Sequence, residues 1–230
     1  MGSSIRPIRS SRGRAAVCLL ALGVFGGCAS IDLQPAYEPP REQTIPSSVV
    51  VDKPFDQAWA GFVRRLSSSF FEVNNISKES QFISISVHRN QAQDFIDCGR
   101  LSYKVGGKHW TFRPDQPGRY TGGSGFRATT VIDHDVKSYL GRMNVVIQPD
   151  GGGTLFEVNT SYAFAMQTTG RDEVRNLLGQ VTNAEHLDPM QASFRFTTKA
   201  PDEQPFGPVT VRCQATGVWE QLILDLARRS

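Results

Sequence analysis

The sequence has few of the residues and spacings on which catalytic and metal sites depend. It contains four cysteines and four histidines. No two histidines have three to five residues between them and no C-x₂-C pair occurs, which argues against a zinc site of the usual ligand spacing. Gly106-Gly107-Lys108 lacks the upstream glycine and the Ser or Thr of a phosphate-binding loop, and residues 123–125 lack the G-x-S-x-G frame of a nucleophile elbow. We therefore predict no catalytic residue, no metal site and no cofactor.

Long apolar runs are also missing. None reaches the roughly 20 residues that a bilayer-spanning helix needs. The clearest run, residues 15–25, follows a basic head that has no acidic residue, and it is followed by Gly26-Gly27-Cys28. This order of basic head, short apolar run and small-residue exit is typical of an export signal. The basic head contains Arg6, Arg9, Arg12 and Arg14.

A cysteine directly after two glycines resembles the lipobox of bacterial lipoproteins. The last two positions of that motif match, while Phe25 stands where the family has Leu or another aliphatic residue. The resemblance implies that residues 1–27 are a signal peptide and that Cys28 becomes the lipidated amino terminus. Because Ala29 follows the cysteine and no Asp does, it also implies anchoring in the outer membrane, facing the periplasm. The competing interpretation is an ordinary secreted protein that is cut near Ser30.

A strong charge of either sign is missing from the rest of the chain. Residues 1–27 contain four of the 25 basic residues and none of the 22 acidic residues, so removal of the signal leaves a nearly neutral protein. No clustered basic face remains, which gives no reason to expect a nucleic-acid partner. The expected partners are the membrane, through the lipid, and a second protein of the envelope.

Two cysteines remain after Cys18 leaves with the signal and Cys28 takes the lipid. These are Cys98 and Cys213. In an oxidising compartment an even pair predicts a disulfide. Two free, buried thiols are the alternative.

The chain after the signal divides into a tether and a domain. Residues 28–46 hold four prolines among polar side chains, so we expect an extended tether there. Residues 47–230 are expected to form a single domain. Apolar residues at helical spacing from Phe55 to Leu66 and from Val218 to Ala227 predict a first and a closing helix.

A third, shorter helix is predicted over residues 171–181, with Val174, Leu177, Leu178 and Val181 facing inward. Between the helices, β-rich runs, most of them with period-two alternation, predict about seven antiparallel strands. Their apolar positions lie within residues 83–87, 101–105, 128–136, 143–147, 156–166, 192–196 and 209–213.

We therefore predict an α+β fold in which an antiparallel sheet is packed by two helices. This order resembles the helix-grip architecture, including the domains of the C-subunit lipoprotein of the β-barrel assembly machine. Residues 95–99 and 213–220 also resemble segments of proteobacterial lipoproteins that have no assigned function. These resemblances imply no catalytic residue.

Residues 113–127 form the candidate binding loop, since loops between strands often carry binding residues. The cluster Asp133-His134-Asp135 is the most suggestive of chemistry. On a strand, however, the two carboxylates share one face and the imidazole takes the other, so the three groups cannot converge. The candidate binding residues are Arg113, Arg119, Tyr120, Phe126 and Arg127.

Two classes of function follow from these observations. The first is a membrane-anchored envelope lipoprotein with a non-catalytic domain that binds or scaffolds a partner. The alternative is a carrier or binding module for a small apolar ligand or lipid, because a helix across a curved sheet can enclose a pocket. A cavity lined by Phe156, Tyr162 and Phe164 would favour the ligand. A filled core with an exposed apolar patch would favour the partner.

Overall fold

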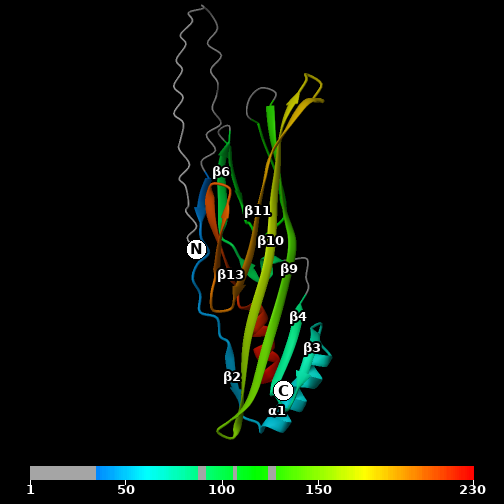
Figure 1. Ribbon diagram of the computed structural model, residues 1–230, viewed down its shortest axis with the longest axis vertical. Coiled ribbons are helices and arrows are strands. Elements are labelled where there is room, and N and C mark those ends of the chain that lie inside the picture. The colour runs from blue at the N-terminus through cyan, green and yellow to red at the C-terminus, as the bar shows by residue number, and fades with distance from the viewer. Residues whose placement is uncertain (1–34, 88–91, 106–107, 124–127) are drawn as a thin grey trace, which may run out of the picture. The chain divides into compact units, whose positions relative to one another are not determined.

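The computed structural model describes residues 35–87, 92–105, 108–123 and 128–230, and these residues are mostly β-strand (Figure 1). The two α-helices are α1 (Phe55–Ser67) and α2 (Val218–Arg228), and a 3-10 turn spans Ala92–Asp94. The strands are β1 (Pro35–Glu38), β2 (Ser48–Val51), β3 (Glu72–Ser77), β4 (Phe82–Val87), β5 (Ile96–Asp97), β6 (Arg100–Val105), β7 (Lys108–Phe112), β8 (Gly118–Gly123), β9 (Ala128–Asp150), β10 (Gly153–Arg175), β11 (Val181–Thr197), β12 (Asp202–Phe206) and β13 (Val209–Ala215).

The long antiparallel hairpin of β9 and β10 organises the fold. Each strand has 23 residues, several times the usual length, and Gly151 and Gly152 turn the chain between them with φ angles of 57° and 105°. The main sheet has the order β11-β10-β9-β4-β3, while β2 pairs with β10 and β8 pairs with β9. Two smaller sheets have the orders β1-β6-β7 and β12-β13-β5.

A bulge divides the hairpin into two parts. Ala165 pairs with Ser138 and Met166 pairs with Val136, so Lys137 is an extra residue in β9. Because side chains alternate between faces, this extra residue changes which positions of β9 point inward. Tyr139, Met143, Val145 and Ile147 are buried on one side of it, and Thr130 and His134 are buried on the other.

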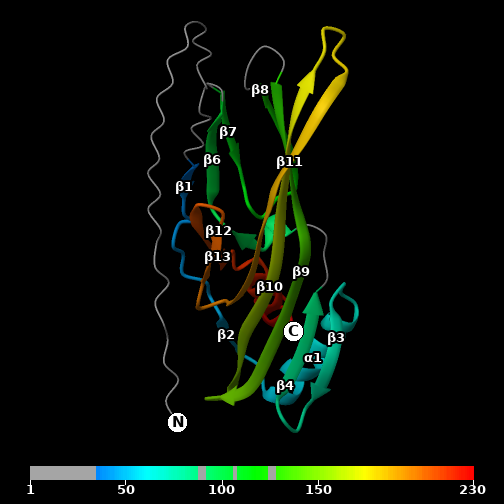
Figure 2. The ribbon, with the colours of Figure 1, turned by 45° about the horizontal axis from the view of Figure 1, so that its top comes forward.

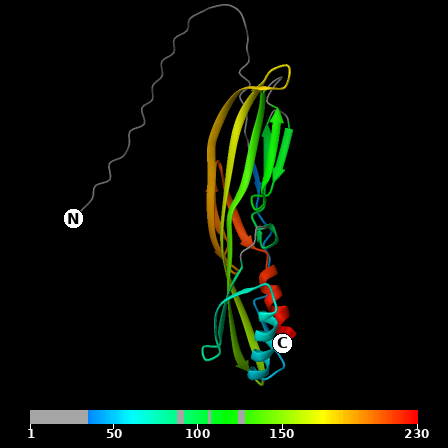
Figure 3. The same ribbon diagram turned by 90° about the vertical axis from the view of Figure 1, so that its right-hand side faces the viewer.

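One part of the hairpin, here called the helical end, is covered by the two helices (Figure 3). The predicted helical stripes are confirmed: Trp59, Phe62 and Leu66 of α1 are buried, as are Trp219 and Ile223 of α2. They pack on the apolar face of β4, β9 and β10. The rings of Phe62 and Phe156, for example, lie 5.2 Å apart between centroids.

The predicted disulfide is present. Cys98 and Cys213 are bonded, and both are fully buried. Cys98 lies between β5 and β6, and Cys213 lies in β13, which leads into α2. The bond therefore joins the connection between β5 and β6 to the strand that precedes α2.

Residues 35–46, expected as part of an extended tether, lie against the domain. β1 pairs with β6, and the Tyr37 hydroxyl donates to the carbonyl oxygen of Arg212 over 3.0 Å. The Gln43 side-chain amide donates to the carbonyl oxygen of Ala215 over 3.0 Å. Residues 28–34, the rest of the predicted tether and including Cys28, lie outside the described residues.

The predicted α+β, helix-grip-like fold is wrong, because strands rather than helices cover much of the sheet. The third predicted helix is also wrong. Residues 171–175 end β10, residues 176–180 form a turn, and Val181 begins β11. The apolar side chains expected to face inward are exposed instead, with Leu177 79% and Leu178 83% exposed. Their helical spacing coincides with a hairpin in which Gly179 takes a φ of 78°.

Candidate functional site

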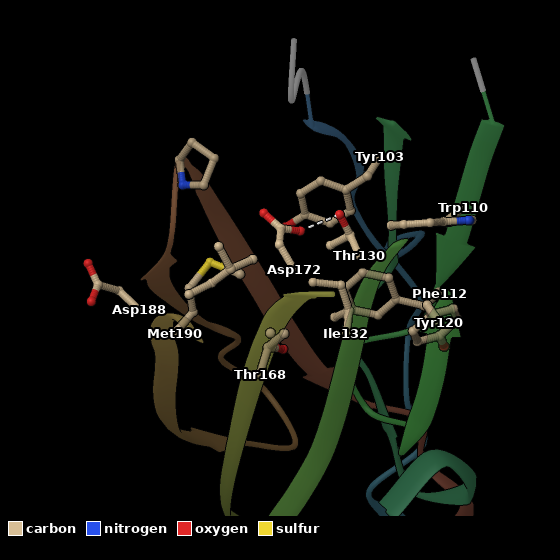
Figure 4. A pocket seen from close by; sticks show the side chains of 13 residues that line it. Tyr103, Trp110, Phe112, Tyr120, Thr130, Ile132, Thr168, Asp172, Asp188 and Met190 are labelled. Carbon is tan, nitrogen blue, oxygen red and sulfur yellow. Dashed lines mark hydrogen bonds between the residues drawn. The ribbon is translucent and has the colours of Figure 1, made fainter. Parts of the chain in front are cut away.

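A cleft of about 310 Å³ lies beyond the bulge, at the end of the hairpin away from the helices (Figure 4). It is bounded by β6, β7 and β8 on one side and by β9, β10 and β11 on the other, and we call this part of the fold the cleft end. Its volume lies at the lower limit of ordinary small-molecule sites. The lining residues are Tyr103, Trp110, Phe112, Tyr120, Thr130, Ile132, Thr168, Gly170, Asp172, Leu187, Asp188, Met190 and Pro208.

Small and polar residues on the inner face of the hairpin leave room for the cleft. Thr130 is the register partner of Asp172, and Ile132 is that of Gly170. A Cβ atom on Gly170 would lie 2.9 Å from the terminal Cδ1 atoms of both Ile132 and Leu187. Glycine therefore lets these two aliphatic side chains approach the strand from either side.

Aromatic side chains form the opposite wall. The Phe112 ring stacks on Tyr103, with centroids 5.8 Å apart and planes at 5°, and lies 5.2 Å from the Tyr120 ring. Trp110 lies directly on the backbone of β8, because a Cβ atom on Gly122 would be only 1.8 Å from its Cζ2 atom. The wall is thus fixed by ring contacts and by a glycine.

His134 holds the loop that contains Pro114 against the hairpin, next to the cleft. It is 1% exposed, and its Nε2 lies 2.8 Å from the carbonyl oxygen of Pro114 while its Nδ1 lies 2.6 Å from the Thr168 hydroxyl. Because a carbonyl can only accept, Nε2 carries the proton and Nδ1 accepts from Thr168. Burial lowers the pKa of His134, which favours this neutral form. Both ring nitrogens are therefore occupied by structural hydrogen bonds.

Two polar groups of the cleft are available to a ligand. The Thr130 hydroxyl donates to the Asp172 carboxylate over 2.5 Å, which leaves that carboxylate further acceptor capacity. The Tyr103 hydroxyl is buried and has no hydrogen-bond partner within the described part of the chain. Burial raises the pKa of Tyr103, so the phenol is a neutral donor. A buried donor without a partner is costly, and a ligand acceptor would remove that cost.

Of the three predicted binding residues that the structure describes, Tyr120 alone lines the cleft. Arg113 donates to the buried Asp115 over 2.8 Å, and Arg119 lies 3.4 Å from Asp133. Burial raises the pKa of Asp115, and the guanidinium of Arg113 offsets part of that rise. These contacts give both arginines roles within the fold, and Phe126 and Arg127 lie outside the described residues.

A cavity lined by Phe156, Tyr162 and Phe164, which would have favoured a ligand, is absent, since these side chains are at most 2% exposed. By that criterion alone the core favours a partner, so the case for a ligand rests on the cleft at the other end of the hairpin. The Asp133-His134-Asp135 cluster diverges as the strand alternation predicts. Asp133 contacts arginines and Asp135 contacts Lys137, while His134 points into the interior.

Sequence reasoning missed most of the cleft because its walls come from six strands. Lining residues such as Tyr103 and Met190 are far apart in the chain, and both belong to strands that look unremarkable in isolation. A usable signal was present in β10. Its inner positions change from large apolar residues to Thr168, Gly170 and Asp172.

Within the described ranges, no three His, Cys, Asp or Glu side chains gather into a group that could hold a metal ion. Nor is any helix of that part of the chain long and apolar enough to cross a bilayer. Compared with protein-family models, curated proteins and solved structures, the chain matches none of them.

Proposed function

We propose that this chain is a lipid-anchored envelope protein whose domain binds a small apolar ligand in the cleft and catalyses no reaction on it. The cleft is the observation that carries this proposal. Its lining is mostly aromatic and aliphatic with a few polar groups, which is the composition of small-molecule sites. The Tyr103 phenol and the Asp172 carboxylate would orient the ligand through its polar group.

The filled helical end favours the cleft as the binding site. Its aromatic side chains are buried against each other, whereas the cleft offers a space of about 310 Å³. The second pocket, lined by residues such as Glu42, Lys199 and Arg212, is more polar and smaller, at about 220 Å³. An apolar ligand therefore fits the first pocket better.

Two further features support the envelope location. The amino-terminal segment has the order of a lipoprotein signal, with Cys28 as the residue that would carry lipid. A fully buried Cys98–Cys213 disulfide is typical of proteins that mature in an oxidising compartment. Mass spectrometry of the mature amino terminus tests the anchor, and an unmodified terminus after Cys28 would contradict it.

Ligand binding is tested with a fluorescent acyl-chain probe and the purified mature protein. Leu187→Trp fills the cleft from β11, while Val73→Trp places the same ring on β3, far from it. The two positions are matched in exposure, at 37% and 39%. We expect Leu187→Trp to weaken probe binding at least about tenfold and Val73→Trp to leave it unchanged. Equal binding by both variants would overturn the assignment of the cleft.

A further inference from the structure

The turn that joins β10 to β11, here called the tip, carries the two most exposed large hydrophobic side chains of the described chain. Leu177 is 79% exposed and Leu178 83%, the highest values among its large hydrophobic residues. Val174 and Val181, on either side, are 42% and 46% exposed. Adjacent exposed apolar side chains of this kind mark interaction sites.

The tip is a built turn that holds its leucines outward. The Asn176 side-chain oxygen accepts from the backbone N–H groups of Leu178 and Gln180, each over 3.0 Å. The backbone N–H of Asn176 donates to the carbonyl oxygen of Gln180 over 2.9 Å. Arg175 donates to the carbonyl oxygen of Gly179 over 2.9 Å. The exposure of the leucines is therefore set by a hydrogen-bonded turn.

The tip lies at the cleft end. Asp172 lines the cleft and stands four residues before Asn176, about 13 Å along the strand. Leu187 lines the cleft and is also 37% exposed, and Val181 at the start of the same strand is 46% exposed. Figure 2 shows the turn between β10 and β11 in the same half of the domain as β6, β7 and β8, away from α1.

The chain also enters the domain at this end. β1 begins at Pro35, and Pro35 is the register partner of Tyr103 in the cleft wall. The seven steps from Cys28 to Pro35 span at most about 25 Å when fully extended. A lipid on Cys28 would therefore hold the cleft end, rather than the helical end, close to the bilayer.

From these positions we infer that Leu177 and Leu178 insert into the bilayer that holds the Cys28 lipid, and that the cleft exchanges its ligand with that bilayer. The choice of membrane rests on the proposed anchor, and the exchange rests on the proposed ligand. A protein partner fits the tip less well, because a stable interface buries about 800 Å² on each side and involves 20 to 30 residues. A projecting pair of leucines beside a lipid anchor has the size and place of a second membrane contact.

The insertion is tested on the mature lipidated protein bound to phosphatidylethanolamine and phosphatidylglycerol vesicles. Leu178→Cys introduces a free thiol, since Cys98 and Cys213 are bonded to each other and Cys28 carries the lipid. An environment-sensitive dye on that thiol should shift to the blue and lose at least about half its emission when nitroxide lipids are present. The control, Ile76→Cys on β3, is 44% exposed and should show neither change. Identical behaviour at both positions would overturn the inference.

The exchange is tested with the double change Leu177→Asp and Leu178→Asp. Uptake of the acyl-chain probe from vesicles should slow at least tenfold, while uptake of the same probe from detergent should be unchanged. Unchanged uptake from vesicles would overturn the exchange. If the wild-type protein takes no probe from either source, the ligand proposal and the exchange both fail, while dye quenching at position 178 still reports the insertion. Crosslinking of position 178 to an envelope protein, without quenching by lipid, would assign the tip to a protein partner instead.

Discussion

The helical end and the cleft end are built on the same two strands, yet one is filled and the other is hollow. On β10, the inner positions of the helical end are occupied by Phe156, Tyr162 and Phe164, all buried. Beyond the bulge Met166 is still large and buried, but the inner positions that follow are Thr168, Gly170 and Asp172, and here the covering layer stands off to leave the cleft. The size of the inner side chains along one strand thus separates the part that stabilises the protein from the part that can bind.

The largest effect should come from a substitution that creates a cavity in the helical end. Phe156 is fully buried against Phe62, so Phe156→Ala should lower the free energy of unfolding by about 3–5 kcal/mol. Trp110→Ala at the cleft wall should cost less than half as much, because it widens a space that is already open. Urea denaturation of the two variants measures the difference. Equal losses would mean that the two ends do not differ in packing as described.

Removing the disulfide should affect both ends together. Cys98→Ser combined with Cys213→Ser releases a crosslink across 115 residues and should cost about 2–5 kcal/mol. Cys98 precedes a wall of the cleft and Cys213 precedes α2, so probe binding should weaken along with thermal stability. Thiol labelling of the denatured, unreduced wild-type protein first shows that Cys98 and Cys213 are bonded. Loss of stability with unaltered probe binding would show that the cleft end does not depend on the bond.

Two buried tyrosines sharpen the comparison, one at each end. The Tyr162 hydroxyl donates to the buried Glu220 carboxylate at 3.0 and 3.1 Å, whereas the Tyr103 hydroxyl has no partner within the described chain. Tyr162→Phe leaves Glu220 with one donor fewer and should cost about 1–3 kcal/mol of stability. Tyr103→Phe should leave stability unchanged or slightly higher, and should weaken probe binding about tenfold. Thermal unfolding should show the larger loss of stability in Tyr162→Phe, and probe titration should show the larger loss of binding in Tyr103→Phe. The opposite order would contradict the comparison.

The smallest effect concerns pH. Burial lowers the pKa of His134 in the folded chain below its ordinary value of 6.5. The unfolded chain therefore binds a proton first, so the domain should lose stability as the pH falls below 6.5 and should gain nothing from this group above it. In His134→Gln the same pH series should be flatter. Chemical denaturation between pH 7.5 and 5 compares the two slopes, and parallel slopes would contradict a buried neutral imidazole.

Local patterns predicted part of this structure. The stripes of α1 and α2 and the alternation of β10 are strong enough to fix the element without tertiary information. The disulfide followed from the compartment and from the count of remaining cysteines. The helix predicted over residues 171–181 was wrong because a helical spacing of four apolar residues can also arise in a hairpin. Here Asn176 and Gly179 decide the conformation.

The cleft was beyond local patterns because it depends on which strands meet. Among the predicted binding residues that the structure describes, Tyr120 lines it, and it does so from within strand β8 rather than from a loop. Arg113 and Arg119 were predicted as residues of a binding loop, but each lies beside an acidic residue of the fold. Register and topology, which bring Thr130 opposite Asp172, become visible only once the chain is folded.

Lys137, the extra residue of β9, changes which alternate residues of that strand point inward. On one side of it Thr130 and Ile132 face the cleft and His134 the interior, and on the other side Tyr139, Met143 and Val145 face the core. Deletion of Lys137 would exchange the two faces of β9 throughout the cleft end, so that Asp133 would point inward and His134 outward. An exposed lysine with no part in the core or the cleft is thus a position where substitution is tolerated and deletion is not.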